Sequence, residues 1–246
     1  MHWVYLSPHF DDVALSCGGL VWEQVQAGNR VSIWTVCAGE PPVGELSPFA
    51  QELHARWQAG LDAPAWRKME DLNSCSRLGA DSRYLSFLDC IYRQQPTSRQ
   101  FLYASEAALN GPLQPGDDQT VAALREELEQ SIQASMNIVC PLAIGDHVDH
   151  QLTRSALEGM DCPLWYYADY PYVERDRERL ENMAQTGWLS QVFPISHNGL
   201  AAWQDSIAAH ASQISTFWTG EAEMRQAIEG YLGWNNGIRL WRRDYT

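Results

Sequence analysis

The sequence predicts an α/β protein in which helices cover both faces of a mainly parallel β-sheet. Short runs of β-branched and aromatic residues alternate along the chain with longer segments whose apolar residues follow a helical period. One of these runs, residues 30–37 (RVSIWTVC), is typical of a strand that is buried on both faces, as strands of parallel sheets are. Two other predicted strands are followed directly by acidic and histidine residues, at the edge where open α/β sheets bind their ligands.

The N-terminal part of the chain begins this alternation. The run HWVYL ends at Ser7-Pro8, and the apolar residues from Val13 to Val25 then predict a helix that stops near Gly28, a residue suited to a helix C-terminus. A second helical region should break near Asp62–Pro64. In chain order we expect a strand over 2–6, a helix over 13–25, a strand over 30–37, two helical pieces within 49–80 and a strand over 84–88.

The remainder of the chain continues the pattern. Residues 92–118 are polar and contain several Pro and Gly residues, which predicts a long excursion on the surface. Regular elements resume after it without an internal repeat or a linker, so we expect a single domain over 1–246. These elements are a helix over 119–134, a strand over 137–144, a helix over 151–160, a strand over 164–168, a last strand over 191–195 and a helix over 201–214.

Composition excludes several classes of protein. The chain has 246 residues and a formal net charge of −14, so it lacks the basic surface that binds nucleic acid or a membrane surface. We find no long apolar run and no basic region at the N-terminus, so we expect neither a membrane span nor a signal peptide, and a cytoplasmic protein. The six cysteines are scattered without a CxxC pair, which indicates reduced thiols.

The segment SPHFDDVAL (7–15) lies where the first strand should pass into the first helix. It places His9, Asp11 and Asp12 within four residues, and each can bind a metal ion or transfer a proton. Either aspartate could instead cap the helix. Two adjacent carboxylates repel each other, however, unless a cation or hydrogen-bond donors compensate. The segment therefore favours a metal or catalytic site over a simple helix start.

The segment GDHVDHQ (145–151) follows the predicted strand over 137–144 and so lies at the same kind of strand end. His147 and His150 have the i,i+3 spacing that places both imidazoles on one face of a helical turn, with Asp149 between them. Histidine and aspartate without a thiolate, in a three-ligand set that leaves one position open, are typical of catalytic zinc. The two segments together predict metal-assisted hydrolysis of an amide or ester.

The two segments resemble the hallmark motifs of the LmbE-like (PIG-L) family of zinc-dependent N-deacetylases. The family's PHPDDE and HPDH motifs read PHFDDV (8–13) and HVDH (147–150) here. RKMEDLNSCSRLGA (67–80) is similar to the family's helix that ends in Leu-Gly, FLDC (87–90) to its next strand, and HASQI (210–214) to a late helix. The resemblance implies a Rossmann-like three-layer sandwich.

Carried over by motif position, the resemblance implies one zinc ion per chain, bound by His9, Asp12 and His150. Asp11 would be the general base for the attacking water, and His147 would stabilise the oxyanion or assist departure of the amine. The implied reaction removes an N-acetyl, or another N-acyl, group from an amino sugar or glycosylated small molecule. The oligomeric state stays open.

Two further residues are candidates for contacting the substrate. The resemblance suggests that Arg67 reaches a hydroxyl or phosphate group, although Arg67 could equally pair with Glu70 or Asp71 on its own helix. Asp89 ends a predicted strand beside the expected pocket, where its carboxylate could accept hydrogen bonds from sugar hydroxyls. The resemblance favours this role for Asp89.

The sequence departs from the family pattern at three positions. Phe10 replaces a proline and should add an aromatic wall, Val13 replaces a glutamate, and Gly145 stands where some members carry a tyrosine near the oxyanion. Val13 and Gly145 motivate the alternative of a catalytically inactive metal- or sugar-binding member of the same fold. The candidates to replace the missing tyrosine, which are otherwise core or rim aromatics, are Tyr166, Tyr167 and Tyr172.

Other residues have a structural interpretation. Cys17 with Gly18-Gly19 should pack the first helix against the sheet, and His210 could lie in the pocket or on the surface of its helix. The chain has neither the GxGxxG turn of a dinucleotide-binding enzyme nor the GxSxG elbow of a serine hydrolase. The histidines without a partner motif, which we expect to be structural, are His2, His54 and His197.

Overall fold

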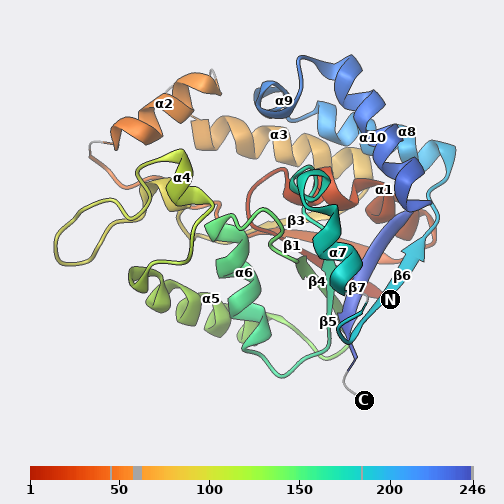
Figure 1. Ribbon diagram of the computed structural model, residues 1–246, viewed down its shortest axis with the longest axis horizontal. Coiled ribbons are helices and arrows are strands. Elements are labelled where there is room, and N and C mark those ends of the chain that lie inside the picture. The colour runs from red at the N-terminus through yellow and green to blue at the C-terminus, as the bar shows by residue number, and fades with distance from the viewer. Residues whose placement is uncertain (45, 58–62, 184, 245–246) are drawn as a thin grey trace.

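A computed structural model describes residues 1–44, 46–57, 63–183 and 185–244. Within these ranges all the strands belong to one sheet (Figure 1). The strands are β1 (His2–Ser7), β2 (Arg30–Thr35), β3 (Asp81–Tyr84), β4 (Met136–Pro141), β5 (Leu164–Tyr167), β6 (Trp188–Phe193) and β7 (Ile238–Arg243). The α-helices are α1 (Asp12–Gln26), α2 (Pro48–Arg56), α3 (Ala63–Leu78), α4 (Glu106–Leu109), α5 (Asp118–Ser131), α6 (Val148–Glu158), α7 (Arg177–Met183), α8 (His197–Ala208), α9 (Ala211–Phe217) and α10 (Glu221–Asn235).

The sheet has the strand order β3-β2-β1-β4-β5-β7-β6. β1 pairs in parallel with both β2 and β4, and β3 and β5 continue the parallel arrangement outward. β7 is antiparallel to β5 on one side and to β6 on the other. The predicted mainly parallel α/β class is confirmed.

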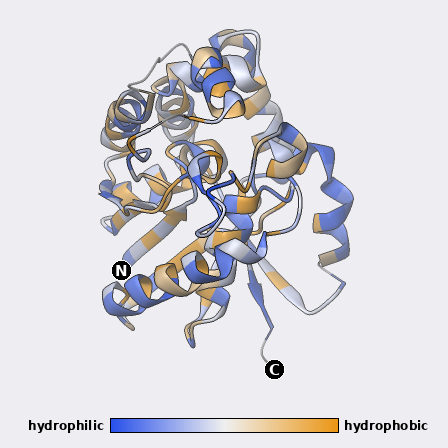
Figure 2. Ribbon diagram, turned by 90° about the vertical axis from the view of Figure 1, so that its left-hand side faces the viewer, coloured by the Kyte–Doolittle hydropathy of each residue, from blue (hydrophilic) through white to orange (hydrophobic). Residues whose placement is uncertain are grey.

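Helices cover both faces of the sheet, as predicted (Figure 1). α1, α3 and α8 pack against one another on one face, and α5 packs against α6 on the other. The strands between these layers are buried, and Val4, Tyr5 and Leu6 of β1 have no exposed surface. Figure 2 shows hydrophilic and hydrophobic residues alternating around the outer helices, as expected for helices that bury one side against a sheet.

The two glycines of α1 allow a close contact with α8. A Cβ atom at Gly18 would lie 2.6 Å from Cδ1 of Trp203, and a Cβ atom at Gly19 would lie 3.1 Å from the same indole ring. Trp203 is buried and donates its Nε1–H to the carbonyl of Ala14 over 2.7 Å. We expected Cys17 and these glycines to pack α1 against the sheet. For the glycines this expectation is wrong, because they face Trp203 of α8.

Several elements have other boundaries than predicted. The third strand is β3 at Asp81–Tyr84 and not residues 84–88, because after Leu85, whose N–H donates to the carbonyl of Thr35, the chain leaves the sheet. The helix predicted over 201–214 is divided into α8 and α9, with His210 at the junction. The predicted break near Asp62–Pro64 falls between α2 and α3, and Asp62 itself lies outside the described residues.

The C-terminal part contains elements that we did not predict. The strand expected over 191–195 is β6 at Trp188–Phe193, and it is followed by α10 and a further strand, β7. The sequence of β7, IRLWRR, mixes arginines with apolar residues, so it lacks the continuous apolar run of a buried parallel strand. The short helix α7 also falls in a region for which we predicted no element.

The excursion over 92–118 is only partly superficial. It contains α4 and a 3₁₀ helix, η3 (Pro115–Asp117), and it buries the side chains of Tyr103, Leu109 and Asp117. Tyr103 and Leu109 join residues of α2 in a second hydrophobic cluster, separate from the cluster around the sheet. The prediction of a surface excursion is therefore wrong for these anchoring residues.

All six cysteines are free and five of them are buried, as the scattered spacing predicted.

Within the described part of the chain, no helix has both the length and the apolar character needed to cross a membrane.

Candidate active site

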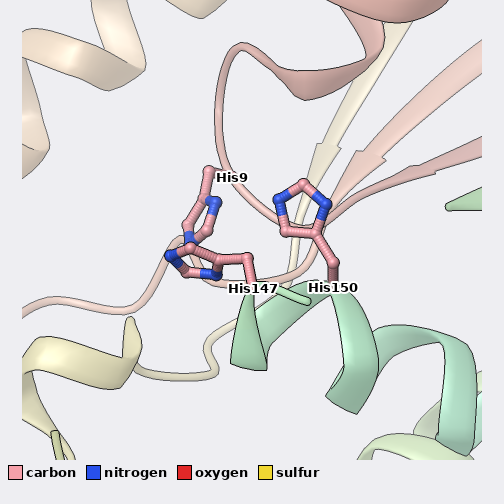
Figure 3. Close-up of side chains that lie close together, drawn as sticks. All are labelled: His9, His147 and His150. Carbon is pink, nitrogen blue, oxygen red and sulfur yellow. The ribbon is translucent and has the colours of Figure 1, made fainter. Parts of the chain in front are cut away.

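The two predicted half-sites meet at one edge of the sheet. Because β1 and β4 are adjacent parallel strands, the turns that follow them leave the sheet at the same edge. His9 lies in the turn between β1 and α1, His147 is the N-cap of α6, and His150 lies in the first turn of that helix. Figure 3 shows the three imidazoles grouped together, and ring nitrogens of all three lie within 4.8 Å of one another.

Asp12 joins the two half-sites. Its Oδ2 lies 3.2 Å from Nδ1 of His9, and its Oδ1 lies 3.3 Å from Nε2 of His150. Oδ2 also accepts the backbone N–H of His9 over 2.7 Å, which fixes the orientation of the carboxylate. The three residues expected to bind a metal ion therefore come together around one carboxylate.

The histidines on either side of Asp12 each have a second carboxylate behind them. Nδ1 of His150 lies 2.6 Å from Oδ1 of Asp169, and Nε2 of His9 lies 3.0 Å from Oδ2 of Asp149. An ionised carboxylate only accepts, so these bonds place a proton on the ring nitrogen that faces away from Asp12. The nitrogen that faces Asp12 can then offer a lone pair, as in carboxylate–histidine–metal arrangements.

The donor atoms fit a metal ion. Nε2 of His150 is buried and has no hydrogen-bond partner among the described residues, and a carboxylate oxygen faces it at 3.3 Å. Two such lone pairs repel each other unless a proton or a metal ion lies between them. Two imidazole nitrogens and a carboxylate oxygen are ligands that zinc accepts, and three ligands leave one position open. His9, Asp12 and His150 therefore form a candidate metal site.

Two buried thiols also lie near this site. Cys37 lies within 4.8 Å of donor atoms of His9 and Asp149, and Cys90 is equally close to His147 and Asp149. Burial raises the pKa of both thiols, and the charge of Asp149 raises it further. Because the thiolate is the form that binds a metal, these neutral thiols are poorer ligands than the imidazoles and the carboxylate.

At His9 and His150, neighbouring carboxylates and burial shift the pKa in opposite directions. Burial by itself lowers the pKa of His9, but contacts with Asp12 and Asp149 outweigh it and raise the pKa well above 6.5. Burial acts in the same way on His150, where Asp12 and Asp169 raise the pKa to about 10. The carboxylates around both rings thus favour positive charge, which a proton or a metal cation can supply.

His147 differs from the other two histidines. Burial, together with the charges of His9 and His150, lowers the pKa of His147 to about 3, so its ring is neutral. Its Nδ1 accepts the backbone N–H of Asp149 over 3.3 Å as the N-cap of α6. The proton is therefore on Nε2, which makes His147 a hydrogen-bond donor in the wall of a cavity.

Asp11 and Arg67 form a buried ion pair beside the candidate metal site. Nη2 of Arg67 lies 3.4 Å from Oδ1 of Asp11, and each side chain is 8% exposed. Asp11 occupies the N-cap position of α1 but its side chain makes no capping hydrogen bond, so the capping role considered for it is not observed. The guanidinium of Arg67 also lies 4.6 Å from the centre of the Trp57 ring, which holds it in place.

The alternative partners considered for Arg67 are engaged elsewhere. Glu70 accepts the backbone N–H and the hydroxyl of Ser212 over 2.9 and 2.6 Å. Asp71 accepts the phenol of Tyr84 over 2.7 Å. The ion pair of Arg67 is therefore with Asp11, across two elements, and not within its own helix.

A cavity of about 580 Å³ opens over this group of residues. Arg67 and Asp89, the two candidates for substrate contact, both lie in its lining together with Asp11 and His147. Asp89 also accepts the backbone N–H of Ile91 over 3.2 Å as the N-cap of the 3₁₀ helix η2 (Cys90–Tyr92). The lining also includes aromatic and acidic residues from four other segments, among them Trp57, Glu106, Tyr172, Phe217 and Trp218.

Two departures from the family motif do not touch the cavity. Val13 is buried in the hydrophobic core around the sheet. Phe10 is buried against Tyr84 and is not among the described residues that line the cavity, so the expected aromatic wall at this position is wrong. Neither side chain is therefore part of the described lining of the cavity.

The third departure, Gly145, makes room for Tyr172. A Cβ atom at Gly145 would lie 2.7 Å from Cβ of Tyr172, and the backbone of Gly145 has a φ of +93° that favours glycine. The Tyr172 ring stands edge-on to His150 at 5.9 Å and lines the cavity. Of the three candidate tyrosines, Tyr172 lies at the site, whereas Tyr166 and Tyr167 are core residues.

The other histidines lie outside the cluster. His210 is buried and not on the surface, its Nε2 has no hydrogen-bond partner within the described chain, and burial lowers its pKa to about 4. His2 bonds to Ser32 over 2.9 Å and His54 to Tyr92 over 2.5 Å, which agrees with the structural role expected of them. His197 is exposed at the start of α8.

Two residues near the site escaped the sequence reasoning. Asp169 follows β5 directly, so the rule that singled out acids at strand ends could have found it. Arg93 forms an ion pair with Asp149, and nothing in the local sequence indicates that partner, because the two residues lie in different segments.

Comparisons with known proteins identify relatives of this chain. Residues 4–160 match the PIG-L family, described as GlcNAc-PI de-N-acetylase. The chain is 32% identical over 202 residues to a 2′-N-acetylparomamine deacetylase from Niallia circulans, a match that covers 75% of this chain and 71% of that protein. It is 30% identical over 184 residues to a protein of the same name from Streptomyces fradiae, a match that covers 72% of this chain and 60% of that protein.

Solved structures share the fold. The zinc-inhibited form of teicoplanin deacetylase superposes with a TM-score of 0.79 at 24% identity, over 100% of both chains. N,N′-diacetylchitobiose deacetylase from Pyrococcus horikoshii superposes with a TM-score of 0.52 at 16% identity, over 98% of this chain and 82% of that one. These likenesses confirm the predicted Rossmann-like three-layer fold. Since the family match spans more than half of the sequence and the motif residues converge as expected, the chain belongs to the PIG-L (LmbE-like) family of N-deacetylases.

Proposed function

We propose that this protein is a zinc-dependent N-deacetylase that removes an acetyl group, or another N-acyl group, from an amino sugar or glycosylated small molecule. One observation carries the proposal: the carboxylate of Asp12 lies between Nδ1 of His9 and Nε2 of His150, beside a cavity. These three residues would hold one zinc ion per chain. When bound, zinc acidifies water and polarises the carbonyl of the amide to be cleaved.

Asp11 is the general base in this proposal. Its carboxylate lines the cavity next to Asp12 and lies 3.4 Å from the guanidinium of Arg67. An ionised carboxylate can accept a proton from water as the water attacks the carbonyl carbon. Asp11 makes no capping hydrogen bond, and its ion pair with Arg67 is formed by Oδ1, so Oδ2 can accept the proton.

His147 is the hydrogen-bond donor. Because its Nδ1 accepts the N–H of Asp149, its Nε2–H is free to donate. A donor at this point stabilises negative charge on the carbonyl oxygen as the tetrahedral intermediate forms, or assists the departing amine. His147 lines the cavity together with Asp11, so base and donor can act on the same amide.

The substrate is an N-acylated amino sugar on a small scaffold. The cavity of about 580 Å³ lies within the range of roughly 300–1,000 Å³ that is typical of small-molecule sites. Both curated relatives are named for the deacetylation of 2′-N-acetylparomamine. Asp89 can accept hydrogen bonds from sugar hydroxyls and Arg67 can donate to them, since both lie in the cavity lining.

The experiment is a turnover assay on a panel of N-acetylated amino sugars that includes 2′-N-acetylparomamine and N-acetylglucosamine. We expect acetate release by the zinc-loaded protein, loss of activity with a chelator and recovery with one equivalent of zinc. A purified protein that neither contains zinc nor gains activity when metal is added would contradict the proposal. Binding of zinc and of an amino sugar without turnover would instead indicate the inactive binding member.

A further inference from the structure

A chain of buried charges extends from His9 away from the cavity, and the proposed reaction does not use it. Asp149 has no exposed surface, and its Oδ2 accepts Nε2–H of His9 and the backbone N–H of Cys90, each over 3.0 Å. Its other oxygen, Oδ1, is paired with Nη1 of Arg93. Both oxygens of Asp149 are thus committed, one toward His9 and one toward Arg93.

Arg93 lies at the start of the excursion over 92–118 and is held by residues from later parts of it. Its Nε lies 2.8 Å from Oδ1 of Asp117, and its Nη2 donates to Oδ2 over 3.3 Å. The hydroxyl of Tyr103 donates to the same Oδ2 and accepts the backbone N–H of Gln114 over 2.9 Å. Arg93 therefore bridges two buried carboxylates, one on the excursion and one on α6.

Stability alone does not explain why Asp149, Arg93 and Asp117 are buried together. Removing two carboxylates and a guanidinium from water is costly, and apolar replacements of similar volume are often neutral or stabilising. Here the series of contacts ends at Nε2 of His9, the ring nitrogen that faces away from Asp12. Asp169, which holds His150 in the same way, takes a backbone N–H from Ile144 and no arginine pair is found for it among the described residues.

We propose that Arg93, held by Asp117 and Tyr103, is a positioning residue that fixes Asp149 and thereby the orientation of His9 and the ring nitrogen it presents to a metal ion. Without Arg93, Asp149 could turn one of its oxygens away from His9, and the His9 ring would lose the bond that selects its tautomer. The inference rests on the proposed zinc site.

The same excursion also contributes residues to the lining of the cavity. Glu106 and Leu109 of α4 line the cavity, and Tyr103 and Asp117 lie on either side of this helix in the sequence. This part of the cavity lining is therefore anchored through the residues that hold Arg93. A substitution in this anchor is expected to affect the metal site even though it touches no ligand.

The test is the zinc affinity of the full chain, measured by competition with a chromophoric chelator. Arg93→Met removes the charge, Arg93→Lys keeps it, and Tyr103→Phe removes only the hydroxyl that bonds to Asp117. Arg154→Met is the matched control, because Arg154 also pairs with a carboxylate, that of Glu158, and donates to a backbone carbonyl.

We expect Arg93→Met to weaken zinc binding by up to about 10–100-fold, the usual effect of losing a partner of a metal ligand, because it releases the Asp149 carboxylate that supports His9. Arg93→Lys should recover most of the affinity, Tyr103→Phe should show a smaller loss, and Arg154→Met should bind zinc as the unmodified protein does. A folded Arg93→Met protein with unchanged affinity would overturn the inference. If Arg93→Met does not fold, unchanged zinc affinity in Tyr103→Phe would overturn it.

The two proposals can fail separately. If the unmodified protein binds no zinc, the proposed function fails and the inference fails with it. If the unmodified protein binds zinc and releases acetate, but the variants bind zinc equally well, only the inference about Arg93 fails.

Discussion

Asp11 and Asp12 are adjacent in the chain but have different neighbours. Asp12 contacts the imidazoles of His9 and His150, whereas Asp11 contacts the guanidinium of Arg67. Burial alone raises the pKa of Asp12, but the two histidines outweigh it and lower the pKa well below its usual value. We expect Asp12 to bind metal and Asp11 to transfer protons, a division that follows from their surroundings and not from their type.

The substitution Asp11→Asn separates these two roles. Because the amide cannot accept the proton of the attacking water, we expect kcat to fall by about 10²–10⁴ while the zinc content stays unchanged. Acetate release and metal analysis by mass spectrometry measure the two quantities. Asp81→Asn, at an exposed pair with Arg30, is the control and should behave as the unmodified protein. Loss of zinc together with activity would contradict a role as the base.

The substitution Asp169→Asn probes the support of His150. The amide keeps the size of the side chain but loses the charge that holds Nδ1–H of His150 at 2.6 Å. We expect zinc affinity to fall about 10–100-fold, as it does when such partners of metal ligands are lost. Chelator competition measures the change, again with Asp81→Asn for comparison. Unchanged affinity would show that His150 is oriented by other contacts.

At the scale of elements, α1 depends on residues that are poor helix formers. Glycine inside a helix usually destabilises it relative to alanine, yet Gly18 and Gly19 lie in the middle of α1. The indole of Trp203 occupies the space that a Cβ would need, so the contact between α1 and α8 requires these glycines. The position of α1 matters for the site because Asp12 is its first residue.

Gly18→Ala and Gly230→Ala should change stability in opposite directions. A Cβ at Gly18 would lie 2.6 Å from Trp203, whereas a Cβ at Gly230 in α10 would have no atom within 4 Å. We expect Gly18→Ala to lower the free energy of unfolding by about 1–3 kcal/mol through overpacking. We expect Gly230→Ala to raise it by about 0.5–1 kcal/mol through helix propensity. Urea denaturation measures both, and stabilisation by Gly18→Ala would contradict the packing argument.

At the scale of the whole molecule, His210 links the stability of the fold to pH. Burial, the largest effect, lowers its pKa to about 4, Arg67 lowers it further, and Asp11 and Asp12 act in the opposite direction. Above pH 6.5 His210 is neutral in both folded and unfolded states and contributes nothing to the pH dependence. Below pH 6.5 the unfolded state takes up a proton that the folded state does not, so stability falls until the pH reaches about 4.

The substitution His210→Asn should reduce this loss of stability. Between pH 6.5 and 4.5 we expect the metal-free variant to lose less free energy of unfolding than the unmodified protein, by at most about 3 kcal/mol. Urea denaturation at a series of pH values, with a chelator present, measures the difference. His197→Asn, at an exposed histidine, is the control. Equal slopes for His210→Asn and the unmodified protein would contradict the assignment.

Local patterns in the sequence were enough to predict the class of fold and the two motifs that form the site. The candidate ligands and proton-transfer groups of each motif lie within four residues, His9 to Asp12 and His147 to His150, so their spacing decides which side chains share a face. Apolar patterns likewise located β1, β2, α1 and α5 close to where they lie, because burial on a sheet or against it leaves a period in the sequence. Gly28, with a φ of +78°, follows α1 as expected.

The distant residues that support the site could not be predicted in this way, because they meet only in the folded protein. The pairing of Asp149 with Arg93, of His150 with Asp169 and of Arg67 with Asp11 joins segments that are separate in the chain. The direction of β7 and the contact of Trp203 with the glycines of α1 were also decided in this way. Such contacts depend on how the layers pack, and local periodicity carries no information about partners that meet only after the chain has folded.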